Sequence, residues 1–193
     1  MRDTPGLRAA RMQLGGERVC FTLPKGFSMD AKVWYDTSEK VESEDIMIDE
    51  VRNFVRSHSS LDKEQFMRLA KWKSPRLTGH AKRNSEDEVR EITRIAFSAH
   101  TERCRVTSLI GLAGVGWPMA SVILHVCHND AYPILDVRAL GTLGFAKIPP
   151  YTFEFWNKYV RFCRNAAGEY CASMRDLDRA LFGWSKNTGT ITK

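Results

Sequence analysis

Through the last two thirds of the chain, apolar residues recur every three or four positions, which places them on one face of an α-helix. Within residues 62–73, for example, Phe66, Leu69 and Ala70 share such a face, and Pro75 ends the segment. The same periodicity predicts helices over about residues 45–57, 62–73, 85–99, 103–110, 117–128, 136–144, 153–167 and 174–185.

Residues at the boundaries of these segments are suited to helix ends. Ser85 and Glu88 form a capping box, in which each side chain accepts a hydrogen bond from the other residue's backbone N–H. Asp136 and Thr152 stand at the start of two later helical segments. Short connections and a single kind of periodicity therefore predict a mainly α protein.

The first sixty residues have a weaker pattern. Residues 19–23 alternate enough to predict a short strand between Gly16 and Pro24. Residues 36–50 hold seven acidic residues and a single lysine, which is compatible with a loop. We expect residues 187–193 to be a disordered tail.

The most distinctive stretch joins two helical segments near the middle of the chain. Gly114 and Gly116 are one residue apart, and glycine permits a tight turn and a close approach by another molecule. Pro118 lies in the first turn of the following helix, where its missing N–H is not needed. Backbone amides at such a helix start can bind a phosphate oxygen. A plain turn between two helices would also need these glycines.

The order Gly114-Val-Gly116-x-x-x-Ala120, followed by Asp136, resembles the helix-hairpin-helix DNA glycosylases, the superfamily of endonuclease III. The matching core covers about residues 100–145. The resemblance implies an endonuclease III-like fold, a two-lobed helical bundle with the active cleft between the lobes. It also implies phosphate contacts from the hairpin, made by Gly114, Val115 and Gly116, and in some members a monovalent cation held by hairpin carbonyls.

In strand-cleaving members of that family, a lysine stands two residues after the second glycine, and the catalytic aspartate lies eighteen residues further on. These places are Pro118 and Asp136 here. Because proline cannot form a Schiff base, the resemblance implies a monofunctional glycosylase that uses water and lacks AP-lyase activity. Two alternatives stay open: Asp136 could serve only as a helix N-cap, and Lys73 could replace the missing lysine.

The resemblance also predicts how the chain divides. Residues 61–148 would form the helix-hairpin-helix lobe, and residues 149–186 would pack with the N-terminal segment, residues 1–60, in the second lobe. The four closely spaced cysteines of the family's iron–sulfur domain have no counterpart, so we expect that domain to be absent. Three further segments loosely resemble a small bacterial 8-oxoguanine-glycosylase-like group, namely residues 72–76, 132–138 and 175–181. This looser resemblance does not define a substrate.

Charge is unevenly distributed along the chain. The net charge is +6 with a pI near 9.2, which favours an anionic partner. Residues 68–83 contain six basic residues and no acidic one, in contrast to the acidic residues 36–50. One face could therefore meet a phosphate backbone while another stays solvated, although both runs could also be ordinary solvated helix faces.

Several further residues are candidates for contact with DNA. Trp72, Lys73 and Arg76 combine an aromatic ring with cations, as base-flipping proteins require, although Trp72 could instead belong to the core. Trp117 could face DNA beside the hairpin or cover the core, and Arg138 could contact phosphate or pair with an acidic residue. Trp156, within an aromatic stretch at helical spacing, is a second tentative base-pocket residue beside Trp72, although core packing explains it as well.

Other chemistry has less support in the sequence. His125 and His128 share a helix face but make only half of a tetrahedral zinc site, so we expect no metal. No nucleotide-binding loop is present, and five cysteines without a CxxC pair are typical of a reducing compartment. We therefore expect a cytoplasmic, nucleoid-associated monomer that excises a damaged or mismatched base from duplex DNA without a required cofactor and without a membrane. The alternatives are a non-catalytic helix-hairpin-helix DNA-binding protein and a helical protein-interaction module.

Overall fold

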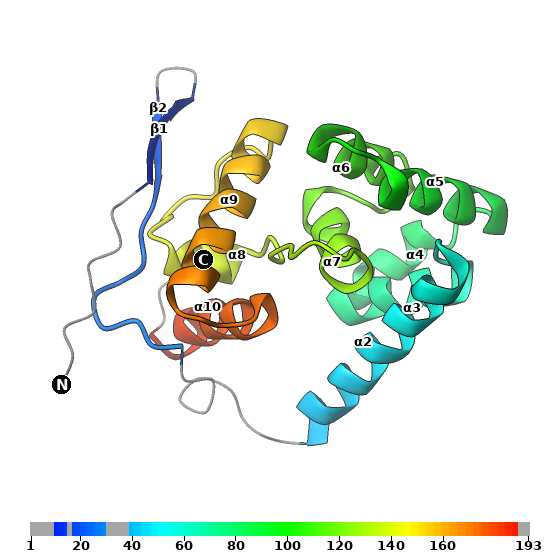
Figure 1. The fold of residues 1–193 in the computed structure, drawn as a ribbon, viewed down its shortest axis with the longest axis horizontal. Coiled ribbons are helices and arrows are strands. Elements are labelled where there is room, and N and C mark those ends of the chain that lie inside the picture. The colour runs from blue at the N-terminus through cyan, green and yellow to red at the C-terminus, as the bar shows by residue number, and fades with distance from the viewer. Residues whose placement is uncertain (1–9, 15–16, 30–38, 189–193) are drawn as a thin grey trace. The chain divides into compact units, whose positions relative to one another are not determined.

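The computed structural model describes residues 10–14, 17–29 and 39–188, and these residues are mainly helical (Figure 1). They fall into two compact units, which meet in the chain at Asp136. The first unit takes the described residues up to Tyr35 together with those from Asp136 onward. The second unit takes the described residues between Asp36 and Leu135. The prediction of a mainly α protein is confirmed.

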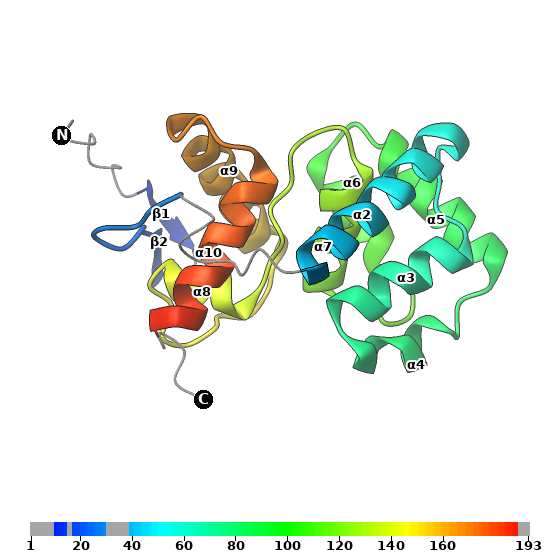
Figure 2. The same ribbon diagram turned by 90° about the horizontal axis from the view of Figure 1, so that it is seen from below.

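The second unit is entirely helical in its described part. Every residue from Met119 to Cys127 is buried, so α7 is the central helix of this unit. Helices α2, α3 and α6 pack against it, and Figure 2 shows α2 and α6 beside it. The elements are α2 (Glu39–His58), α3 (Lys63–Lys73), the 3-10 turn η1 (Pro75–Leu77), α4 (Thr78–Ala81), α5 (Glu86–Ser98), α6 (Glu102–Ile110) and α7 (Trp117–Cys127).

Short polar side chains fix where these helices begin. Asp62 accepts a hydrogen bond from the Gln65 N–H at the start of α3. The predicted capping box of α5 is confirmed: Ser85 accepts from the Glu88 N–H, and the Glu88 carboxylate accepts from the Ser85 N–H at 2.6 Å. Each cap satisfies an amide that has no partner within its helix.

The first unit combines a β-hairpin with three helices. Strand β1 (Ala10–Leu14) pairs antiparallel with β2 (Glu17–Phe21), and Phe21 at the end of β2 is buried among aromatic rings. The ring centroids of Phe155, Tyr159 and Phe162 lie 5.5–5.8 Å from that of Phe21. The three helices are α8 (Val137–Thr142), α9 (Phe153–Glu169) and α10 (Met174–Thr188).

Helix α8 is attached to α10. The Thr142 hydroxyl, which is buried, donates a 2.6 Å hydrogen bond to the Leu181 carbonyl. Leu140 on α8 and Leu181 on α10 are fully buried as well. A short helix of six residues has little stability of its own, so this packing is what holds α8, and with it the residue that precedes α8, in place.

The predicted domain boundaries are wrong in two places. Helix α2 was assigned with residues 1–60 to the second lobe, but it packs on α7 and belongs to the hairpin's unit. Helix α8 was assigned to the hairpin's lobe within residues 61–148, but it packs on α10. In both cases the buried apolar face of the helix decides its unit, and the sequence does not show which face meets which partner.

Several predicted element limits also need correction. The acidic segment expected to be a loop is already helical from Glu39, because exposed acidic residues are compatible with the start of a helix. The short helices η1 and α4 were not predicted. Asn187 and Thr188, expected in a disordered tail, are the last residues of α10, and residues 189–193 lie outside the described part. The strand predicted at residues 19–23 exists as β2, two residues earlier.

Candidate nucleic-acid interface and active site

A tight loop of six residues joins α6 to α7, and Gly114 makes it possible. Gly114 has φ of +83°, a conformation that residues with a Cβ rarely adopt. A Cβ at this position would also lie 3.0 Å from His80 Cβ and 3.1 Å from the Ala81 nitrogen. Gly114 is therefore required twice, for its backbone conformation and for the close packing of the loop on α4.

Gly116 differs from Gly114 because the fold does not demand a glycine there. Its φ is −94°, and the nearest atom to an added Cβ would be Pro118 Cδ at 3.9 Å. Gly116 is exposed and is the N-cap of α7, yet it supplies no side-chain hydrogen bond to the helix. Because Gly116 has no side chain, it obstructs the backbone amides at the N-terminal end of α7 less than any other residue would. An oxyanion can bind to amides at such a helix end.

Val115 is not suited to the phosphate contact predicted for its amide. The Val115 N–H donates to the Leu112 carbonyl at 3.0 Å, and the side chain is 5% exposed. Val115 therefore anchors the loop to the interior of the unit. The sequence pattern predicted phosphate contacts from the amides of Gly114, Val115 and Gly116. The turn uses the Val115 N–H for its own hydrogen bond instead.

Asn84, which sequence reasoning missed, fastens the loop to the segment after α4. Its Oδ1 accepts from the Ala113 N–H at 2.7 Å, and its Nδ2 donates to the Ala113 carbonyl at 2.9 Å. The same Nδ2 donates to the Ala81 carbonyl at 2.9 Å, and Asn84 is only 5% exposed. Asn84 stands alone between a basic run and a helix cap, and no pattern in the sequence indicates that it attaches the hairpin loop.

The basic run predicted to meet DNA lies beside the hairpin. Arg76 is on η1, His80 is on α4, and Lys82 and Arg83 follow α4, and all four side chains are exposed. Lys73 and Trp72, in the last turn of α3, are half-buried. The contact of Gly114 with His80 and Ala81 therefore joins the hairpin to a strongly basic segment of the same unit.

Asp136, the predicted catalytic residue, is the N-cap of α8. Its Oδ1 accepts a 2.8 Å hydrogen bond from the Arg138 N–H, and its side chain is half-buried. The capping role considered for Asp136 is thus present. A negatively charged side chain at a helix N-terminus interacts favourably with the helix dipole, so the cap and a role as an anion in catalysis are compatible.

The chain just before Asp136 is anchored within the hairpin's own unit. The Leu135 N–H donates to Ser121 Oγ at 2.8 Å, and the Ser121 hydroxyl donates to the Pro118 carbonyl at 2.7 Å. Ile134 and Leu135 are buried. The segment that leads to Asp136 is therefore attached to α7, one turn after the hairpin.

Tyr151 is a second residue that sequence reasoning missed, and it belongs to the same unit as Asp136. Burial, and in addition the negative charge of Asp136, raise the pKa of the Tyr151 phenol. The phenol is consequently neutral near pH 7 and lies within the electrostatic reach of the Asp136 carboxylate. Tyr151 is half-buried, with its ring centroid 6.0 Å from that of Phe155.

Two predicted contact residues have other roles in the structure. Trp156 is fully buried, with its ring centroid 6.1 Å from that of Phe153, so it presents no surface to a base. The guanidinium of Arg138 lies over the Phe182 ring at 5.3 Å, and this contact is neither a phosphate nor an acidic partner. Trp156 thus packs in the core, and Arg138 makes a cation–π contact within its own unit. Trp117 is half-buried at the start of α7.

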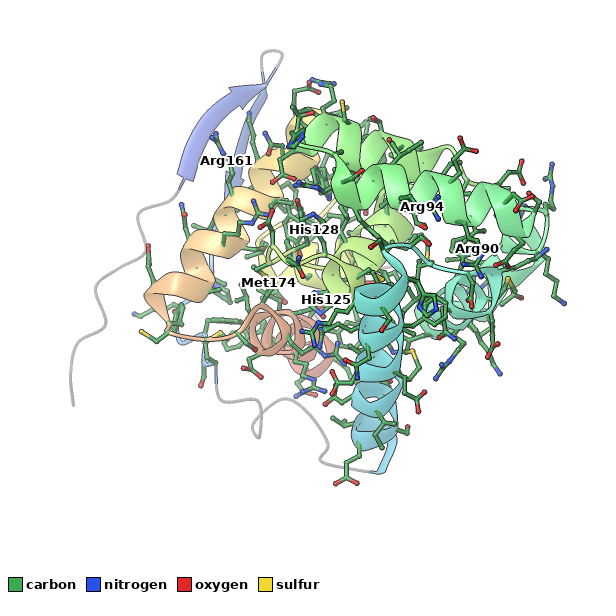
Figure 3. All side chains as sticks on the ribbon, turned by 45° about the vertical axis from the view of Figure 1, so that its right-hand side comes forward. Arg90, Arg94, His125, His128, Arg161 and Met174 are labelled. Carbon is green, nitrogen blue, oxygen red and sulfur yellow. The ribbon has the colours of Figure 1, made fainter. Side chains whose placement is uncertain are left out.

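His125 and His128, labelled in Figure 3, lie at the C-terminal end of α7. His125 is buried, with Nδ1 2.6 Å from the Tyr132 carbonyl oxygen. Tyr132 in turn donates from its hydroxyl to Glu102 at 2.6 Å and accepts from Arg105 at 2.5 Å. Within residues 10–14, 17–29 and 39–188, no group of three or more metal-ligating side chains could hold an ion.

Comparisons of the chain with protein-family models, with curated proteins and with solved structures find no match. No helix in the described ranges has both the length and the apolar character needed to cross a bilayer.

Proposed function

We propose that this chain is a monofunctional DNA glycosylase that removes a damaged or mismatched base from duplex DNA. The observation that carries the proposal is the glycine-capped hairpin between α6 and α7, followed twenty residues after Gly116 by an aspartate at the start of another helix. The hairpin suits a phosphate backbone, and the aspartate suits the chemistry of a glycosidic bond. An endonuclease III-like fold is part of this proposal.

In the proposed mode of binding, the N-terminal end of α7 contacts a phosphate. Gly116 leaves room at this end, and exposed cations follow α4 close by, so the unit offers both amide donors and positive charge. A monovalent cation at the carbonyls of the hairpin would add to this attraction. The target nucleotide rotates out of the stack, because a base within the duplex cannot be reached.

Asp136 is proposed to act on the sugar of that nucleotide. Loss of the base breaks the C1′–N bond and develops positive charge on the sugar, which a nearby carboxylate stabilises. Water then adds to C1′ and gives up a proton, the departing base takes the electron pair of the broken bond and a proton, and an abasic site remains. The hydrogen bond from the Arg138 N–H orients the Asp136 carboxylate.

Pro118 at the position of the family's lysine supports a hydrolytic rather than a lyase reaction, because it offers no amine. For an aromatic residue that contacts the flipped base, Tyr151 replaces Trp156 in the proposal, since its half-buried ring lies in the electrostatic reach of Asp136. Trp72 stays a prediction. The proposed enzyme is a cytoplasmic, nucleoid-associated monomer that needs no nucleotide or redox cofactor.

The test is base excision from duplexes that each carry one lesion or mismatch, including oxidised, alkylated and mismatched purines. Each product is divided, and one half is treated with hot alkali, which cuts at abasic sites. We expect strand breaks in the treated half only, on at least one duplex. Breaks without alkali would contradict the hydrolytic mechanism, and DNA binding without breaks on any duplex would favour the non-catalytic DNA-binding protein.

A further inference from the structure

Two sets of cations in the hairpin's unit can be compared. In α2, α3 and α5, Arg52, Arg68 and Arg90 each form an ion pair with an acidic residue of the unit: Asp49 at 2.8 Å, Glu50, and Glu86 at 2.5 Å. Around η1 and α4 the situation is different. Arg76, Lys82 and Arg83 are exposed, and none of them forms an ion pair with another residue in the described part of the chain.

No acidic residue interrupts the second set in sequence, since none occurs between Gln65 and Ser85. Uncompensated, exposed cations repel one another and gain free energy when an anion with several negative charges covers them. The phosphates of a DNA backbone provide such a row of charges, and they release bound counterions on contact. The charge pattern therefore points to a polyanionic backbone as the occupant.

Asn84 joins this segment rigidly to the hairpin. Its carboxamide makes one hydrogen bond with each polar group of the Ala113 backbone and a third with the Ala81 carbonyl. Lys82 and Arg83 stand between Ala81 and Asn84 in the chain, and successive Cα atoms are about 3.8 Å apart. Their Cα atoms are therefore fixed within about 8 Å of residues that touch the hairpin loop.

We propose that residues 75–83 and the hairpin loop form one DNA-backbone surface, with Lys82 and Arg83 contacting phosphates and Asn84 as the positioning residue that sets their register. This inference rests on the proposed binding of duplex DNA, but not on the proposed excision of a base. Asn84 is buried and does not touch DNA. It acts by holding the loop of Gly114 and Gly116 against the basic segment.

The first arm of the test neutralises charge. Lys82→Gln/Arg83→Gln is compared with Arg90→Gln/Arg94→Gln, which removes the same charge from α5 (Figure 3). On this helix Arg90 and Arg94 lie opposite Ile92, whose Cδ1 would lie 3.8 Å from a Cβ on Gly111, so they face away from the hairpin loop. Binding to a fluorescent undamaged duplex is measured by anisotropy over a range of salt concentrations.

We expect the slope of log K against log salt to become shallower by about 2 in Lys82→Gln/Arg83→Gln, about 1 for each lost phosphate contact. The α5 variant should keep the wild-type slope. Equal slopes in the two double variants, with wild type bound, would overturn the inference and leave DNA binding itself intact. No binding of wild type at low salt would overturn both the inference and the proposed function. Binding without excision of any lesion would overturn the proposed function and leave the inference intact.

The second arm tests Asn84 against a matched residue. Asn84→Ala is compared with Thr93→Ala, because the Thr93 hydroxyl is also buried and also bonds a distant backbone N–H, that of Leu61 at 2.9 Å. Both variants should unfold at lower temperature. Below that transition, Asn84→Ala should bind DNA about tenfold more weakly, and Thr93→Ala should bind as wild type does. Equal weakening in both variants, or in neither, would overturn the positioning role.

Discussion

Two helix N-termini in this chain, those of α7 and α8, are built differently. Gly116 caps α7 without a side-chain hydrogen bond, whereas Asp136 caps α8 with its own carboxylate. Both ends present backbone amides and the positive end of a helix dipole. At α8 the protein supplies the anion itself, and at α7 it supplies none. The same local structure, a helix N-terminus, can therefore hold a built-in anion or leave a place for an external one.

The largest expected effect comes from removing the charge at α8. Asp136→Asn keeps a good N-cap, because asparagine accepts the same hydrogen bond from the Arg138 N–H, but it removes the negative charge. We expect the rate of base excision to fall by about a hundredfold or more. Binding to the same duplex should be unchanged or tighter, and the free energy of unfolding should change by less than about 0.5 kcal/mol. Unchanged excision would show that Asp136 is only a cap.

The reverse change makes the end of α7 resemble that of α8. Gly116→Asp should supply the missing cap but place a negative charge where the phosphate is proposed to bind. We expect DNA affinity to fall by roughly tenfold or more from like-charge repulsion. Gly116→Asn is the matched control, since it offers the same cap without the charge. If the two variants bind DNA equally, charge at this helix end does not control binding.

The two glycines of the hairpin should respond differently to alanine. Gly114→Ala forces a left-handed conformation and a clash with His80 and Ala81, so we expect a loss of about 2 kcal/mol in the free energy of unfolding. Gly116→Ala meets no atom closer than 3.9 Å at an ordinary φ and should cost less than about 1 kcal/mol. Urea denaturation measures both, and equal losses would contradict the distinction.

The smallest effect is expected at the capping box of α5, a third kind of helix N-terminus. The hydrogen bond from the Ser85 N–H lowers the pKa of Glu88 below its usual 4.5. This contribution to stability is fully present above pH 4.5 and is lost as the pH falls through the lowered pKa. Glu88→Gln should therefore be less stable than wild type at pH 7, with a difference that shrinks on acidification. A difference in melting temperature that is constant from pH 7 to pH 3 would contradict this account.

Local signals predicted much of this fold. The capping residues Ser85, Asp136 and Thr152 identified helix starts correctly, because a cap and its first turn are close in sequence. The packing of whole helices was harder. Helix α2 packs on α7, but its sequence shows only that it has an apolar face. That face could have packed against an apolar surface of either unit.

The candidate site shows the same division. Gly114 could be recognised from sequence, because its turn depends on neighbouring residues. Asn84 could not, because its partner Ala113 is 29 residues away. Trp156 was predicted as a base-contacting ring and Tyr151 was not, yet Trp156 is fully buried and Tyr151 only half-buried, a difference that depends on packing distant in sequence.

Single-turnover base excision tests the distinction between the two helix ends most directly. Wild type, Asp136→Asn and Gly116→Asp, each in excess over DNA, are mixed with a duplex that wild type excises, first below and then above the enzyme concentration that saturates binding. We expect Gly116→Asp to recover the wild-type rate at saturation, because only its binding is impaired, and Asp136→Asn to stay slow. A Gly116→Asp variant that remains slow when all DNA is bound, or an Asp136→Asn variant that recovers, would contradict the separate roles of α7 and α8.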